Sequence, residues 1–145
     1  MRPIWYGCLR TTASESASAR LVRIHDACKQ VIDQFHPDAA AIEELFFGAS
    51  AKTALAVGQA RGVCMLACAN AGLQVHEYSP SSIKQAVTGY GRADKVQVQR
   101  MVQVTLGMTE LPQPDHAADA LGVAICHAGS SALERTISTA RTPAR

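Results

Sequence analysis

Short runs of strand-forming residues alternate with longer runs of helical periodicity, and this alternation most constrains the fold. The strand-like runs are "IWYGCLRT" at residues 4–11, "DAAAIE" at residues 38–43 and "LQVHEY" at residues 73–78. Helical signals lie between and after them, at residues 19–35, 51–71, 79–89, 95–106 and from residue 115. This order predicts an α/β domain in which helices pack on a sheet.

The length of the chain matches a single domain. Its 145 residues are 48% hydrophobic, enough to build one buried core. We expect that domain to span residues 1–128, and residues 129–145 to form a polar, basic tail that frays. No apolar run approaches the ~20 residues that cross a membrane. The first residues lack the features of a secretory signal, so we expect a cytoplasmic protein with no membrane partner.

Five cysteines are scattered along the chain without paired short spacings. An odd count of this kind argues against a disulfide framework or a zinc site. Cys64 and Cys68 lie one helical turn apart, and we interpret them as small core residues.

The charge is unevenly distributed although the net charge is only +2. Basic residues dominate the middle of the chain, and they are Lys52, Arg61, Lys84, Arg92, Lys95 and Arg100. A basic surface attracts phosphate groups, whereas a cluster of carboxylates holds cations. The alternative is that these charges belong to ordinary solvated helix faces.

The predicted helix at residues 51–71 is apolar nearly all round, and Gln59 and Arg61 are its main polar interruptions. A helix of this kind must be covered on more than one side. A subunit interface is one way to cover it.

Two places bear acidic residues suited to catalysis. Glu43 follows the apolar "AAAI", at the end of a strand, where α/β sheets open onto their ligand crevice. His116 and Asp119 are three residues apart near the start of a helix and therefore share a face, with Asp115 as the expected N-cap. The alternative for the helix is a capped N-terminus with a carboxylate that offsets the helix dipole.

If Glu43 converges with His116 and Asp119, the carboxylates repel one another unless a divalent cation lies between them. Oxygen ligands suit Mg²⁺, and an imidazole suits Mn²⁺ better or serves as a proton acceptor. Two divalent ions can activate water and stabilise the leaving oxygen of a phosphodiester. Phe46 and Phe47 beside Glu43 can stack on an unpaired base, or they can belong to the core.

Four segments together resemble the RuvC family of bacterial Holliday-junction resolvases. They are "AIEELFF", "GQARGV", "EYSPSSIKQAVTGYGRADKVQVQRMV" and "DHAADALGVAICH". The resemblance runs in order from about Tyr6 to His127. It implies a ribonuclease H-like mixed sheet flanked by helices, a homodimer, and Mg²⁺-dependent nicking of two opposed strands of a four-way DNA junction. It also implies two metal ions per site and the branch-migration proteins RuvA and RuvB as partners.

The resemblance assigns roles to individual residues. Glu43 matches the catalytic glutamate at the strand end, Asp119 the last catalytic aspartate, and His116 a position that is Asp or His in the family; all three are expected to be metal ligands. Phe46 matches the aromatic residue that acts at the junction centre. The residues expected to contact DNA are Phe46, Lys84, Arg92 and Lys95. Those expected at the dimer interface are Gly58, Gln59, Arg61 and Gly62.

One departure from the family pattern stands at the start of the chain. The family opens with a strand of "GIDPG" type whose Asp is a metal ligand, whereas the first acidic residue here is Glu15, in a polar loop. We therefore expect an N-terminally truncated domain without the first hairpin and without one of four ligands. Three hypotheses follow: a junction endonuclease, inactive if that Asp is required; a junction-binding module that does not cleave; and a metal-dependent hydrolase of another phosphate ester.

Overall fold

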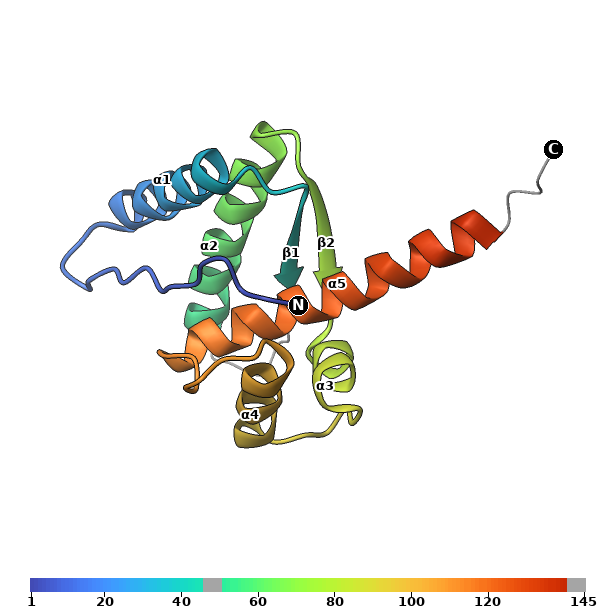
Figure 1. Ribbon diagram of the computed structural model, residues 1–145. Helices are drawn as coiled ribbons and strands as arrows, with labels where there is room; N and C mark the ends of the chain where they lie inside the picture. Colours follow the sequence, from blue (N-terminus) through green and yellow to red (C-terminus); the bar gives the residue numbers. More distant parts are fainter. Residues whose placement is uncertain (46–50, 141–145) are drawn as a thin grey trace. The chain divides into compact units, whose positions relative to one another are not determined.

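Five helices and two strands make up the part of the chain described by a computed structural model, residues 1–45 and 51–140 (Figure 1). The chain divides into two units, and each is described by itself. One unit is Leu9–Glu77, and the other combines Met1–Cys8 with Tyr78–Arg145.

The first unit holds helix α1 (Ala17–Phe35), strand β1 (Ala39–Glu43), helix α2 (Ala51–Asn70) and most of strand β2 (Gln74–Tyr78). The two strands are parallel neighbours, and α2 connects them (Figure 1). Parallel strands need such a crossover helix because a tight turn cannot join them. The predicted elements at residues 19–35, 38–43, 51–71 and 73–78 are therefore confirmed, and α1 packs on α2.

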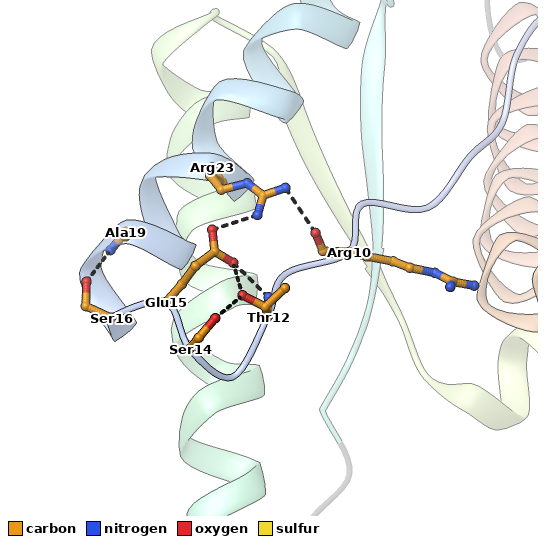
Figure 2. Close-up of polar contacts among 7 residues, drawn as sticks. All are labelled: Arg10, Thr12, Ser14, Glu15, Ser16, Ala19 and Arg23. Atoms are coloured by element: carbon orange, nitrogen blue, oxygen red, sulfur yellow. Dashed lines mark hydrogen bonds and ion pairs between the residues drawn. The ribbon is translucent and has the colours of Figure 1, made fainter.

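Hydrogen bonds and an ion pair fix the start of α1 (Figure 2). The Ser16 hydroxyl accepts a hydrogen bond from the Ala19 N–H at 3.2 Å, which makes Ser16 the N-cap. Glu15 accepts the Thr12 N–H at 2.7 Å and pairs with Arg23 at 2.6 Å. These donors, the Thr12 N–H first, lower the pKa of Glu15. Glu15 is therefore engaged in building the loop before α1.

The strand predicted at residues 4–11 is wrong. These residues form neither strand nor helix, and the side chains of Ile4 and Trp5 are 84% and 55% exposed. Strand preference yields a strand only when the backbone pairs with a neighbour. In the part of the chain that the structure describes, the sheet is limited to β1 and β2.

The second unit is a group of three packed helices, α3 (Pro80–Thr88), α4 (Lys95–Thr105) and α5 (Asp115–Ala140). Ser79 caps α3 as predicted, with Pro80 at the first helical position. Asp94 caps α4 and forms a reciprocal capping box with Gln97. Buried apolar side chains from the three helices make the core, among them Ile83, Val87, Val98, Val102, Leu121 and Ile125.

Helix α5 differs from expectation at both ends. Asp115 is its first helical residue rather than its N-cap, and the Ala117 N–H donates to the Pro114 carbonyl at 2.7 Å. At the other end the helix continues to Ala140, where the sequence predicts a tail from residue 129. The extension contains Ala132, Leu133, Glu134 and Arg135, which favour a helix, and a single Gly129 costs only about 1 kcal/mol inside a helix. None of the helices in the described part of the chain is long and apolar enough to span a membrane.

Candidate active site

The first turn of α5 and the first residue of α4 bring a cation and two carboxylates together. The Lys95 Nζ lies 3.3 Å from Asp115 Oδ2 and 3.8 Å from Asp119 Oδ2. His116 Nδ1 lies 3.9 Å from the same Asp119 oxygen. We call Lys95, Asp115, His116 and Asp119 the α5 cluster.

Local sequence signals place the α5 cluster. The capping box at Asp94 starts α4 at Lys95, so the lysine stands at the helix N-terminus. On α5 the buried Ala117 and Ala118 lie between His116 and Asp119, and α4 packs against α5. The buried alanines face the core, and the cluster residues on either side of them remain accessible to solvent.

The side chains of the α5 cluster are open to solvent. The His116 side chain is 82% exposed, and the Asp119 side chain is 44% exposed. The ammonium of Lys95, followed by the side chain of Gln99, lowers the pKa of Asp115. Because these groups are hydrated, their mutual attraction is modest. The cluster is therefore accessible to an incoming cation or phosphate.

Glu43 is the last residue of β1, and both Glu43 and the following Glu44 are exposed. The Arg61 guanidinium holds this strand end. Its Nε donates to the Glu43 carbonyl oxygen at 3.2 Å, and its Nη2 forms an ion pair with Glu77 of β2. The guanidinium thus ties the ends of both strands to α2.

This role of Arg61 was not foreseen from the sequence, which predicts it at a dimer interface. The side chain is only 18% exposed, and a second donor, Nη1, reaches Met65 Sδ at 3.3 Å. The one signal available in the sequence is that Arg61 is the single charged residue between residues 53 and 76. A lone charge in so apolar a helix needs an internal partner.

The residues predicted to bind DNA lie on different elements and differ in exposure. Lys84 is half-buried on α3, Arg92 is exposed in the loop between α3 and α4, and Lys95 belongs to the α5 cluster. All three lie in the second unit. Phe46, the fourth predicted contact, lies outside the described residues, as does its neighbour Phe47.

The predicted interface residues of α2 are partly exposed. Gln59 and Gly62 are exposed, whereas Gly58 is half-buried, with space for a Cβ at 3.7 Å from Leu45 Cδ1. Gln59 also lines a cavity of about 250 Å³ with residues of α1. Exposed leucines lie on the same face of α2, where Leu55 is 65% and Leu66 is 55% exposed.

The donor chemistry of the predicted metal ligands suits a hard divalent cation. Glu43 and Asp119 offer carboxylate oxygens, and His116 offers a ring nitrogen one helical turn away. Within the described residues of either unit, no three His, Cys, Asp or Glu side chains gather as a ligand set. The predicted set joins Glu43 of one unit with His116 and Asp119 of the other, and their convergence stays a prediction.

Comparisons with known proteins point to one family. The family model described as crossover junction endodeoxyribonuclease RuvC matches residues 1–127. The RuvC of Moorella thermoacetica is 55% identical over 127 residues, covering 88% of this chain and 76% of that relative. The RuvC of Chloroflexus aurantiacus is 54% identical over 128 residues, covering 88% of this chain and 78% of that relative.

Solved structures agree with the sequence relatives. A structure of Thermus thermophilus RuvC superposes with a TM-score of 0.81 at 40% identity and covers 87% of this chain and 76% of that chain. The T. thermophilus RuvC in complex with a Holliday junction substrate gives a TM-score of 0.83 at 36% identity, with coverages of 91% and 80%. The predicted ribonuclease H-like α/β fold is thereby confirmed.

Proposed function

The chain belongs to the RuvC family of crossover junction endodeoxyribonucleases, and from this premise we propose that it resolves four-way DNA junctions. The reaction is hydrolysis of one phosphodiester bond in each of two opposed strands, in recombination and DNA repair. The observation that carries the proposal is the match over residues 1–127, which includes both Glu43 and the whole α5 cluster. A relative of the same fold has been solved with a Holliday junction substrate.

We assign the metal ligands of this metal-dependent nuclease to Glu43, His116 and Asp119. Their oxygen and nitrogen donors support Mg²⁺, with Mn²⁺ as the other suitable ion, and two ions per site. Such ions supply an activated water and a neutralised leaving oxygen at the phosphodiester. The alternative role for His116, if it does not bind a metal, is to accept a proton from the attacking water through its exposed ring.

We propose that Lys95 pairs with carboxylates in the free protein and with a DNA phosphate in the complex. In the free protein its ammonium lies beside Asp115 and Asp119 and offsets their charge. With Asp119 holding a cation, Lys95 would be released from that carboxylate and could contact a DNA phosphate. Lys84 and Arg92, in the same unit, extend the cationic surface, and Phe46 stacks on a base at the junction centre.

A homodimer is the assembly that we propose for cutting two strands. On α2 the exposed Leu55, Gln59, Gly62 and Leu66 follow steps of four, three and four, so they share one face. Two copies joined through this face would carry two active sites. We further propose that the dimer works with RuvA and RuvB in the cytoplasm, where the bacterial chromosome lies.

A junction-cleavage assay tests the proposal. Incubation with Mg²⁺ and a labelled four-way junction is expected to yield symmetric nicks in opposed strands. Asp119→Asn should reduce the nicking rate by at least about 100-fold and leave junction affinity nearly unchanged, because it removes a metal ligand and no phosphate contact. The matched control is Asp26→Asn, on exposed α1, which should cleave like the parent.

Each other outcome selects a different function. Tight junction binding without nicking in Mg²⁺ or Mn²⁺ would replace the proposal with a binding module. Hydrolysis of a small phosphodiester in preference to junction DNA would replace it with a general phosphoesterase. Wild-type nicking by the Asp119→Asn protein would overturn the role of Asp119.

A further inference from the structure

Two cysteines far apart in the sequence face each other between α1 and α2. The Cys28 Sγ lies 3.6 Å from the Cys64 Sγ, close enough for the Cys28 thiol to donate a hydrogen bond. Both side chains are half-buried, and both belong to the first unit. The two positions are 36 apart in the sequence, and no short spacing pairs them.

The pairing makes the two thiols chemically unequal. The hydrogen bond from Cys28 stabilises the Cys64 thiolate and lowers the pKa of Cys64. The same hydrogen bond, together with burial, raises the pKa of Cys28. A thiolate is the nucleophilic form of cysteine, so Cys64 is the attacking member and Cys28 remains a thiol.

We propose that Cys28 and Cys64 are an oxidisable thiol pair that a peroxide converts into an intramolecular disulfide linking α1 to α2. In the first step the Cys64 sulfur attacks hydrogen peroxide, its O–O bond breaks, and Cys64 sulfenic acid and one water form. In the second step the Cys28 sulfur attacks the Cys64 sulfur, the S–O bond breaks, and a second water leaves. Two thiols are oxidised and one peroxide is reduced to two waters.

The geometry suits this bond. A disulfide requires its sulfur atoms about 2.05 Å apart, and rotation of two cysteine side chains that already face each other supplies the remaining approach. The other cysteines are placed differently. Cys68 is buried one turn further along α2, Cys126 lies in the second unit, and Cys8 is exposed. Cys64 is therefore the attacking thiol with a partner already in place.

The test is peroxide treatment of the protein, followed by blocking of free thiols and peptide mapping by mass spectrometry. We expect a Cys28–Cys64 cross-linked peptide, lighter than the two reduced peptides by two hydrogen atoms and restored by a reducing agent. Absence of this cross-link in the wild-type protein would overturn the proposal, as would a link from Cys28 to Cys68.

Serine variants distinguish the roles of the two thiols. Cys28→Ser should stop the reaction at the Cys64 sulfenic acid, which dimedone traps, whereas Cys64→Ser should show no dimedone adduct at Cys28. Cys126→Ser is the matched control and should form the cross-link as the wild type does. Circular dichroism checks that each variant is folded, and a dimedone adduct at Cys28 in the Cys64→Ser protein would refute the assignment.

Discussion

Two cationic side chains, one in each unit, each hold a pair of oxygen partners. Lys95 lies beside Asp115 and Asp119, and Arg61 joins the Glu43 carbonyl to Glu77. The sequence indicated the acidic residues, because strand ends and helix starts have local signals. It did not indicate their cationic partners, because each pair bridges segments at least 16 residues apart and depends on tertiary packing.

The titration of Asp115 is a direct measure of its contact with Lys95. The ammonium favours the charged carboxylate and lowers its pKa from the ordinary value of 3.8. A lowered folded pKa stabilises the fold above the ordinary pKa, and this contribution is lost as the pH falls through the folded pKa. Lys95→Met should raise the pKa of Asp115, as measured by NMR titration of its carboxyl carbon.

A matched lysine provides the control for this titration. Lys29 pairs with Asp33 on α1, in the other unit, and is 63% exposed. Lys29→Met should leave the Asp115 titration curve unchanged. A curve that does not move in Lys95→Met would show that another group lowers the pKa.

At the level of elements, the helices of the second unit pack closely around a glycine. A Cβ at Gly122 of α5 would lie 3.4 Å from Ile83 Cγ2 of α3 and 4.0 Å from Val102 Cγ2 of α4. The sequence predicted most elements because periodicity and caps are local. It failed at residues 4–11, where a strand requires a partner, and at the continuation of α5, where nothing in the sequence ends the helix.

Substitutions at Gly122 test that packing. Gly122→Ala should change the free energy of unfolding by less than about 1 kcal/mol, because better helix propensity offsets the tight contact. Gly122→Val should destabilise the protein by about 1–3 kcal/mol through overpacking. Gly129→Ala, at an uncrowded position on the same helix, is the control and should be neutral or stabilising. Urea unfolding measures all three, and equal effects of Val and Ala at Gly122 would contradict the packing.

At the scale of the whole molecule, the catalytic prediction joins residues from two units. Glu43 lies in one unit and His116 and Asp119 in the other, so no local pattern can establish that they meet. The resemblance to a family predicted their shared site because it covers both units at once. The same holds for the dimer, which was predicted from one apolar helix and from the resemblance.

The proposed dimer face gives a prediction of its own. Leu66→Glu places a charge on the exposed face of α2 and should convert the dimer into monomers, because a buried unpaired charge opposes association. Sedimentation equilibrium measures the mass. Val104→Glu on α4, a residue that is 72% exposed, is the matched control and should remain dimeric. A dimer that persists in Leu66→Glu would place the interface elsewhere.

The Lys95 ammonium beside Asp115 and Asp119 has a further consequence for how the protein matures. The lysine is a counterion for both carboxylates, so the start of α5 needs no metal ion to balance their charge. Folding and metal loading become separate events, in contrast to small zinc domains that stay unfolded without their ion. A chelator should then abolish cleavage while the protein remains folded.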